Sequence, residues 1–310
     1  MSHIVTITFN PCIDKSAAVS QLIPEKKLSC TEPRFEPGGG GINVARAIKK
    51  LGGGATAIYP SGGYTGKFFN ELLAKENIPA IIIEIENSLR ENVIVIEESS
   101  NRQFRFGFPG AKLTEQEWQQ CIDAIDKINN AEFLVASGSL PGGVPDDIFA
   151  RLATIAKKKN LKLVVDTSKA ALRHAANEGV FMLKPNLNEL SSLLGRKELG
   201  IEEVATAAKQ IIEKRYCEVL LVSLGEKGAM LFTQHDQLKV SAPKVEKRST
   251  VGAGDSMVAG FVLTLSQGKN FENALRYGVA CGTAATMQPG TELCNKKDAD
   301  ALYQIIASEK

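Results

Sequence analysis

Two patterns of hydrophobic and polar residues alternate along the chain. Short, nearly continuous runs of Val, Ile, Leu and Phe are typical of strands that are buried on both faces of a sheet. Six such runs are predicted as strands: Ile4–Phe9, Ala57–Pro60, Phe133–Ser137, Lys162–Asp166, Phe181–Lys184 and Val219–Ser223. Between them, apolar residues recur at helical spacing, which predicts five helices: Gly41–Leu51, Gly66–Glu76, Thr114–Asn129, Asp146–Lys158 and Ile201–Lys214. The alternation indicates βαβ units, in which helices cover both faces of a parallel sheet.

Two stretches, Ser16–Glu36 and Arg90–Phe108, have strand character without an intervening helix. Their apolar and polar residues alternate, which is typical of an antiparallel sheet with one solvated face. We expect a single α/β domain over residues 1–310, into which these stretches insert a small β-sheet lid. An isolated small sheet exposes apolar surface, so we also expect two lids to pair in a homodimer.

Composition excludes several classes of protein. Hydrophobic residues make up 44% of the chain and charged residues 23%, with a net charge of +2, so neither nucleic acid nor a membrane is an expected partner. No apolar run approaches the roughly 20 residues of a membrane span. The six cysteines form no C-x-x-C pair, and the N-terminus does not resemble a signal peptide. We therefore expect a cytoplasmic protein.

The stretch from Ser249 to Ser256 carries the strongest chemical signal, since a glycine-containing turn leads directly into an apolar run. Unpaired N–H groups at a helix N-terminus, together with glycines, form a cradle for phosphate. Asp255 would repel that phosphate unless it takes a proton from the group that attacks it. Taken alone, Asp255 could equally be a favourable acid in the first helical turn. A serine hydrolase built on Ser256 would need a nearby histidine base, and no suitable histidine follows it.

A second glycine cluster, Gly38–Gly41, precedes Asn43 and a predicted helix. Four consecutive glycines cost backbone entropy and favour close approach of the backbone to a polar ligand. Further polar groups follow predicted strands, at the sheet edge where open α/β sheets bind ligands. These groups are Asp14, Ser139, Asp166, Lys184 with Asn186, and Ser223 with Gly225.

Both glycine signatures resemble those of the PfkB-type carbohydrate kinases, which have the ribokinase-like fold. The segments Ser137–Pro141, Lys184–Leu190 and Val222–Ala229 also match that family, in the expected order. The resemblance covers essentially the whole chain and implies a three-layer α/β/α sandwich with a β-sheet lid. The block Glu36–Ile48, the stretch Arg102–Phe106 and the ending Gly290–Cys294 resemble the 6-phosphofructokinase subgroup.

The resemblance also implies roles for individual residues. Asp255 would be the general base, and the amides of Gly252, Ala253 and Gly254 would form the anion hole. The implied sugar-phosphate ligands are Asp14, Gly39, Asn43, Arg90, Arg105, Ser139 and Lys27, the last of these from a partner's lid. The implied ATP-binding residues are Lys184, Asn186, Ser223, Gly225 and Gly228. Glu189 would hold Mg²⁺ through water, and a K⁺ site would lie near Ser249, Val251, Ala285, Gln288 and Gly290.

The expected activity is therefore ATP-dependent phosphorylation of fructose 6-phosphate at the C1 hydroxyl, with ATP and Mg²⁺ as cofactors and K⁺ as a possible third. A tagatose-6-phosphate kinase or a 1-phosphofructokinase of the same family is the alternative, because no motif reads the sugar stereocentre. An inactive sugar-phosphate sensor with the same fold is a third hypothesis.

Overall fold

The structure is a computed structural model and describes residues 3–308. Within that range nine strands form the main sheet, in the order β13-β12-β11-β10-β9-β8-β1-β4-β5. Their bounds are β1 His3–Ile7, β4 Ala55–Ser61, β5 Ala80–Glu84, β8 Ala131–Ser137, β9 Lys162–Asp166, β10 Val180–Leu183, β11 Cys217–Ser223, β12 Ala229–Phe232 and β13 Gln237–Val240. All six predicted strands are present, with ends shifted by up to two residues.

One expectation about the sheet is wrong. Seven of its strands pair in parallel, from β5 to β11, but β12 and β13 are antiparallel to their neighbours. The sheet is therefore mixed, because two short hairpins extend one edge. Strands β12 and β13 have only four residues each, too few to show a clear periodicity in the sequence.

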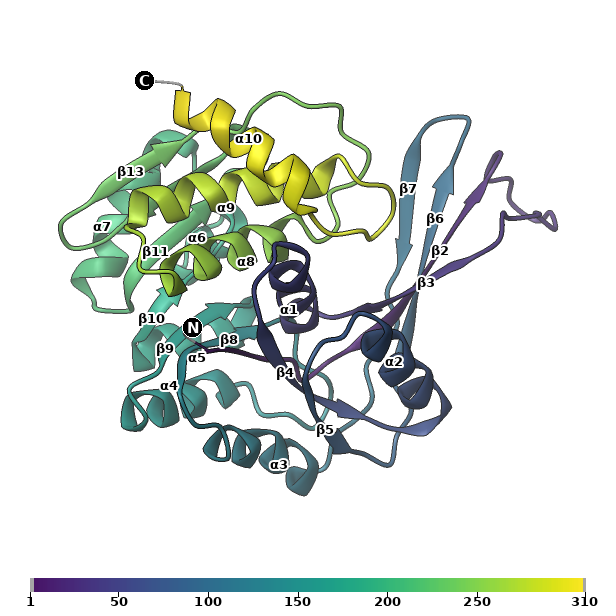
Figure 1. Cartoon of the computed structure of the whole chain (residues 1–310), viewed down its shortest axis with the longest axis horizontal. Helices are drawn as coiled ribbons and strands as arrows, with labels where there is room; N and C mark the ends of the chain where they lie inside the picture. The colour runs from purple at the N-terminus through teal and green to yellow at the C-terminus, as the bar shows by residue number, and fades with distance from the viewer. Residues whose placement is uncertain (1–2, 309–310) are drawn as a thin grey trace.

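Helices cover the sheet on both sides, as the alternation predicts (Figure 1). The five predicted helices correspond to α1 Gly40–Lys50, α2 Gly63–Lys75, α3 Glu115–Asp126, α4 Ile148–Lys158 and α7 Val204–Glu213. Before residue 250, two helices were not predicted, α5 Lys169–Glu178 and α6 Leu187–Leu193, and two 3₁₀ turns add η1 Ile201–Glu203 and η2 Gly225–Lys227. The C-terminal third contains α8 Ala253–Ser266, α9 Phe271–Thr286 and α10 Lys296–Ser308, which pack together.

A second sheet projects from one side of the molecule (Figure 1). In the described part of the chain it has four strands in the order β3-β2-β6-β7, with bounds β2 Cys12–Val19, β3 Arg34–Gly38, β6 Arg90–Glu97 and β7 Arg102–Phe106. We call these four strands the lid. The expectation of an antiparallel sheet is wrong for its central pair, because β2 and β6 run parallel. The first strand also starts earlier than residue 16, so Asp14 lies within it.

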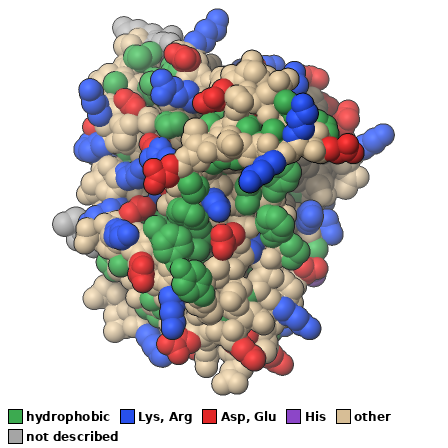
Figure 2. Space-filling view, turned by 90° about the vertical axis from the view of Figure 1, so that its right-hand side faces the viewer, with side chains coloured by type: hydrophobic (Ala, Val, Ile, Leu, Met, Phe, Trp, Pro, Cys, Tyr) green, Lys and Arg blue, Asp and Glu red, His purple; other side chains and the backbone are tan. Residues whose placement is uncertain are grey.

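The lid exposes phenylalanines on one side. Phe104 and Phe106 alternate along β7 and Phe108 follows, with 36%, 50% and 53% of their surfaces exposed. Figure 2, which views the molecule from the lid's side, shows hydrophobic side chains gathered near the centre of this face with charged residues around them. Among residues 3–308, no helix is both long and apolar enough to cross a lipid bilayer.

Candidate active site

Strand β1 lies between β4 and β8. Strands β4 and β5 extend the sheet from β1 to one edge, and the later strands β8 to β13 extend it to the other, so the strand order reverses at β1. Such a switch point leaves a crevice beyond the carboxyl ends of the strands, where open α/β sheets bind ligands. A cavity of about 310 Å³ lies at this edge, lined by Gly40, Ser137, Gly138, Ser139, Asp166, Thr167, Ser168, Glu189 and Asp255.

The glycine run brings helix α1 against these strand ends. A Cβ on Gly40 would lie 2.3 Å from Ser137 Oγ, and one on Gly41 would lie 2.7 Å from the Ile7 carbonyl oxygen. Gly39, the N-cap of α1, has φ of 114°, which favours glycine. The run therefore allows a second kind of close approach, in which the N-terminus of α1 packs directly on β1 and β8.

Asp255 lies in the first turn of α8, which begins after Gly252 in the left-handed conformation (φ 71°). Asn43 Nδ2 in α1 donates a 2.9 Å hydrogen bond to Asp255 Oδ2, across 212 residues of sequence. Burial, with the nearby Asp166 adding to it, raises the pKa of Asp255 to about 7, although Asn43 and Lys184 oppose the shift. An oriented carboxylate with such a pKa suits a general base near neutral pH.

Lys184 supplies a buried positive charge to the same site. Its ammonium lies 3.2 Å from Asp166 Oδ1, and a Cβ on Gly254 would lie 3.5 Å from Lys184 Nζ. Burial would lower the pKa of Lys184, but Asp166 and Glu189 outweigh it and the pKa is raised, so the charge is retained. The ammonium and the N-terminal turn of α8 together form a setting for a phosphate group.

Asp14 is held on the lid by groups that the sequence did not indicate. Asn92 Nδ2 on β6 donates to Asp14 Oδ1 at 2.9 Å, and Cys12 Sγ donates to the same oxygen at 3.3 Å. Burial raises the pKa of Asp14, against the effect of the Asn92 hydrogen bond. A Cβ on Gly38 would lie 2.4 Å from Asp14 Oδ2, so only glycine leaves room for the carboxylate.

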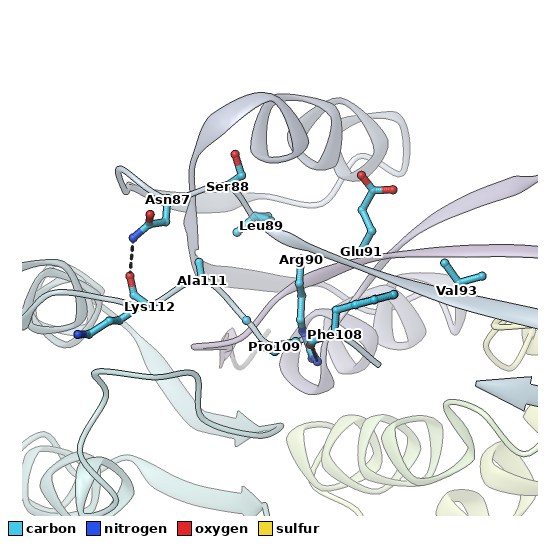
Figure 3. Close-up of a pocket in the computed structure, with 11 residues that line it drawn as sticks. Asn87, Ser88, Leu89, Arg90, Glu91, Val93, Phe108, Pro109, Ala111 and Lys112 are labelled. Carbon is cyan, nitrogen blue, oxygen red and sulfur yellow. Dashed lines mark hydrogen bonds between the residues drawn. The ribbon is translucent and has the colours of Figure 1, made fainter. Parts of the chain in front are cut away.

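Arg90 lies where the lid meets the main domain (Figure 3). Its Nη1 donates to the Phe108 carbonyl and its Nη2 to the Asn10 carbonyl, both at 3.3 Å. Asn10 Nδ2 in turn donates to Ser139 Oγ at 3.0 Å. Arg90 also lines a cavity of about 520 Å³, but in Figure 3 the side chains of Ser88 and Lys112 point away from one another rather than converging there.

Two further basic residues, one on the lid and one in the segment between two lid strands, differ in whether they reach the main domain. Arg105 Nη2 on β7 donates to Thr250 Oγ1 at 3.1 Å, so the lid contacts the turn that precedes α8. Lys27 is exposed in the segment that connects β2 to β3. That segment lies far from the main sheet in Figure 1, and within this chain Lys27 is not brought to the site.

The predicted ATP-binding residues lie beside the ends of β10 and β11. Asn186 caps α6 by accepting from the Glu189 backbone N–H, and a Glu189 oxygen accepts from the Asn186 N–H, both at 2.9 Å. Asn186 also forms a parallel bridge with Ser223. Gly225 and Gly228 follow with φ of 61° and 91°. The same kind of capping box begins α3, where Thr114 pairs with Glu117.

The proposed cation-site residues lie where the C-terminal end of α9 approaches the turn before α8. Ser249 Oγ donates to the Gly290 carbonyl at 2.6 Å, and Val251 N donates to Ser249 Oγ at 3.1 Å. The Ala285 carbonyl accepts from Gln288 N at 3.1 Å. Carbonyl groups at a helix C-terminus favour a cation. The Gln288 side-chain amide, however, donates to Asp298, so its side chain is not directed at this group.

Ser256, the candidate nucleophile of the hydrolase hypothesis, is fully buried, and its hydroxyl accepts from Cys294 N at 3.3 Å. Ser256 therefore lacks the exposed hydroxyl that a hydrolase nucleophile needs. Within residues 3–308, no cluster of three or more His, Cys, Asp or Glu residues could bind a metal ion by itself.

Over nearly its whole length, the chain is similar to known carbohydrate kinases. Residues 6–298 match the family described as pfkB family carbohydrate kinase. The chain is 42% identical over 308 residues to the ATP-dependent 6-phosphofructokinase isozyme 2 of Escherichia coli, covering 99% of this chain and all of the relative. The D-tagatose-1-phosphate kinase of Bacillus licheniformis is 33% identical, covering 96% and 97%. A crystal structure of E. coli phosphofructokinase-2 in complex with potassium aligns with a TM-score of 0.95 at 42% identity, covering 99% and 100%.

Proposed function

The chain belongs to the pfkB family of carbohydrate kinases, and we propose that it is an ATP-dependent 6-phosphofructokinase, which phosphorylates the C1 hydroxyl of fructose 6-phosphate. The ribokinase-like α/β fold expected from the resemblance is confirmed by the full-length structural match. Relatives with other sugar-phosphate substrates are more distant, at 33% identity or below, which favours this substrate.

One observation carries the proposed chemistry: the Asp255 carboxylate borders the cavity of about 310 Å³, is oriented by Asn43, and lies in the first turn of α8. In the reaction, Asp255 accepts the proton of the C1 hydroxyl as that oxygen bonds to the γ-phosphorus of ATP. The bond between this phosphorus and the oxygen that bridges the β- and γ-phosphates breaks, and ADP leaves. Phosphoryl transfer depends mainly on positioning and charge neutralisation, which suits this arrangement.

The surrounding residues would divide the binding of the two substrates. The amides of Gly252, Ala253 and Gly254 and the Lys184 ammonium would neutralise the transferred phosphoryl group. Asp14, Gly39 and Asn43 would hold the sugar hydroxyls, and Arg90, Arg105 and Ser139 would bind the 6-phosphate. Asn186, Ser223, Gly225 and Gly228 would hold ATP. Binding energy at the remote phosphate would thereby fix the position of the reacting hydroxyl.

The residues present fit both proposed metal ions. Mg²⁺ usually keeps several waters and binds one or two carboxylates together with substrate phosphates. Glu189 lines the cavity and engages one carboxylate oxygen in the α6 cap, which leaves the other oxygen for a water of the ion. Ser249, Val251, Ala285 and Gly290 group hydroxyl and carbonyl oxygens that suit K⁺. When bound, the cations would supply positive charge to the phosphates and to the anion hole.

We also propose that two copies pair through their lids. The exposed Phe104, Phe106 and Phe108 provide an apolar surface for pairing. Pairing would also offer a way for Lys27, which is exposed and remote from the site in its own chain, to reach the site of the other copy. The partner's Lys27 would then add a positive charge near the 6-phosphate.

A coupled assay of ADP formation tests the proposed function with fructose 6-phosphate, tagatose 6-phosphate and fructose 1-phosphate at equal concentrations. We expect kcat/KM to be highest for fructose 6-phosphate. A higher value for either other sugar would contradict the substrate assignment but preserve the kinase. Binding of the sugar phosphates without turnover of any would instead favour an inactive sensor.

A further inference from the structure

We propose that Asn10 is a positioning residue, which holds the Ser139 hydroxyl and the Arg90 guanidinium in the arrangement that receives the sugar's 6-phosphate. The inference rests on the proposed function, in which these two side chains bind that phosphate. Asn10 lies just past the carboxyl end of β1, at the switch point of the sheet, and only 8% of its surface is exposed.

Asn10 is bonded to both proposed phosphate ligands at once. Its side-chain amide donates to Ser139 Oγ at 3.0 Å, and its backbone carbonyl accepts from Arg90 Nη2 at 3.3 Å. Ser139 follows strand β8, and Arg90 begins lid strand β6. A single buried residue is therefore bonded both to the end of a main-sheet strand and to the base of the lid, at the point where both would contact one phosphate.

The direction of the first hydrogen bond matters for the chemistry. Because the Asn10 amide donates to Ser139 Oγ, the serine hydroxyl keeps its own proton and can donate it to a phosphate oxygen. The amide oxygen lies directly against Gly110, where a Cβ would be 2.0 Å from Asn10 Oδ1 and only glycine leaves room for it. A carboxylate at this position would instead accept a hydrogen bond from the serine hydroxyl, which would then not donate to the phosphate. It would also place a negative charge near the phosphate.

The Arg90 guanidinium is held from two sides. The Asn10 and Phe108 carbonyls each accept from one of its terminal nitrogens. A guanidinium has five N–H donors, so the two carbonyls orient the group and leave donors for phosphate oxygens. Asn10 contacts both this arginine and, through Gly110, the segment that contains Phe108. Replacing the side chain removes the hydrogen bond to Ser139 Oγ but keeps the carbonyl that accepts from Arg90. The substitution should therefore loosen the Ser139 side of the phosphate site without touching Asp255 or the nucleotide site.

Steady-state kinetics with two variants test the inference. Asn10→Ala should raise KM for fructose 6-phosphate about tenfold, as expected for a lost positioning hydrogen bond, with kcat and KM for ATP within about threefold of wild type. Asn10→Asp should raise the same KM further, by about 100-fold, because of charge repulsion. The matched control is Asn70→Ala, which removes a half-buried amide that accepts from Tyr59 and Ser61 at 3.1 and 3.0 Å, away from the site. It should leave KM for the sugar phosphate unchanged.

A double-mutant cycle separates positioning from a purely structural role. In a Ser139→Ala background, Asn10→Ala should have less than half its effect on log KM, because part of its action passes through Ser139. Additive effects, or a lowered melting temperature with unchanged KM, would overturn the inference. The increase in melting temperature caused by fructose 6-phosphate gives a second readout that needs no turnover. If wild type binds the sugar phosphate without turnover and Asn10→Ala loses that binding, the inference stands while the proposed reaction fails. If wild type neither binds nor turns over the sugar phosphate, both fail.

Discussion

At the scale of single residues, the environment of Asp255 gives the sharpest prediction about catalysis. Asp255→Asn removes the proton acceptor but keeps the shape of the side chain, and the amide can still lie beside Asn43. We expect kcat to fall by roughly 10²–10⁴, the usual contribution of a general base. The coupled assay measures it, with a circular dichroism spectrum as the control for folding. A kcat within threefold of wild type would contradict the role of Asp255.

The same residue predicts a pH dependence of stability in the ligand-free protein. The pKa of Asp255 is raised to about 7 in the folded chain, whereas an exposed Asp has a pKa near 3.8. The folded state therefore holds this proton more tightly, so the associated stability is present below about pH 4 and is lost as pH rises through 7. Relative to wild type, Asp255→Asn should gain melting temperature progressively over this range. A constant difference between the two proteins from pH 5 to pH 8 would contradict the raised pKa.

Much of the site could be predicted from individual residues, but their contacts could not. The glycine signatures and strand-end positions indicated Asp255, Asn43 and Lys184 as candidates. In the structure Asp255 lines the cavity, Asn43 bonds to Asp255, and Lys184 pairs with Asp166 of the same cavity. The raised pKa of Asp255 depends on burial and on Asp166, neither of which leaves a local mark in the sequence. Asn10 also follows a predicted strand, so the signal that identified Ser139 was available for it.

At the scale of elements, a buried arginine joins the lid to two helices. Arg46 of α1 is 2% exposed, and its Nη2 lies 3.2 Å from Glu36 of β3 and 2.7 Å from Glu76 beyond α2. Its Nη1 also donates to the Pro37 carbonyl at 2.8 Å. Glu36 also accepts from Thr291, which follows Gly290 in the loop that carries part of the proposed cation site. The network thus connects the base of the lid, the first helix and that loop.

Removing this arginine should destabilise the protein strongly. Arg46→Met keeps the apolar length of the side chain but leaves Glu36 and Glu76 without a buried partner, so we expect a loss of about 3 kcal/mol in the free energy of unfolding. Urea denaturation measures it. Lys209→Met, which breaks an exposed pair with Glu213, is the control and should change stability by less than about 0.5 kcal/mol. Equal effects of the two substitutions would show that the Arg46 network adds no stability.

Local signals predicted elements well and their pairing less well. The predicted start of a helix at Thr114 is confirmed, because Thr114 caps α3 in a box with Glu117, one turn away. The parallel pairing of β2 with β6 joins residues about 78 positions apart, as for Asp14 and Asn92, and depends on how the whole lid folds. Alternating residues indicate a half-exposed strand but do not specify its neighbour or direction.

At the scale of the whole molecule, the two proposed roles of the lid sheet would link catalysis to assembly. One of its sides carries Asp14 and Arg105, which face the main domain, and Arg105 contacts Thr250. Val93 and Phe106 are paired on the other side, and Phe104 and Phe106 are partly exposed there. A sheet of this size with apolar surface in water favours a partner. The same four strands would thus cover the sugar in their own chain and pair with a second copy.

This arrangement predicts that disrupting the outer side of the lid reduces both assembly and activity. The double substitution Phe104→Ser and Phe106→Ser should shift the protein from dimer to monomer, because it removes two large apolar side chains from the pairing surface. It should also raise KM for fructose 6-phosphate by at least tenfold, because Lys27 of the partner subunit would no longer reach the site. Light scattering gives the mass and the coupled assay gives KM. Ile305→Ser, on α10 and 48% exposed, is the control and should change neither. A wild-type monomer at assay concentration, or a variant that remains dimeric, would contradict pairing through the lid, whereas a monomer with unchanged KM would contradict only the contribution of Lys27.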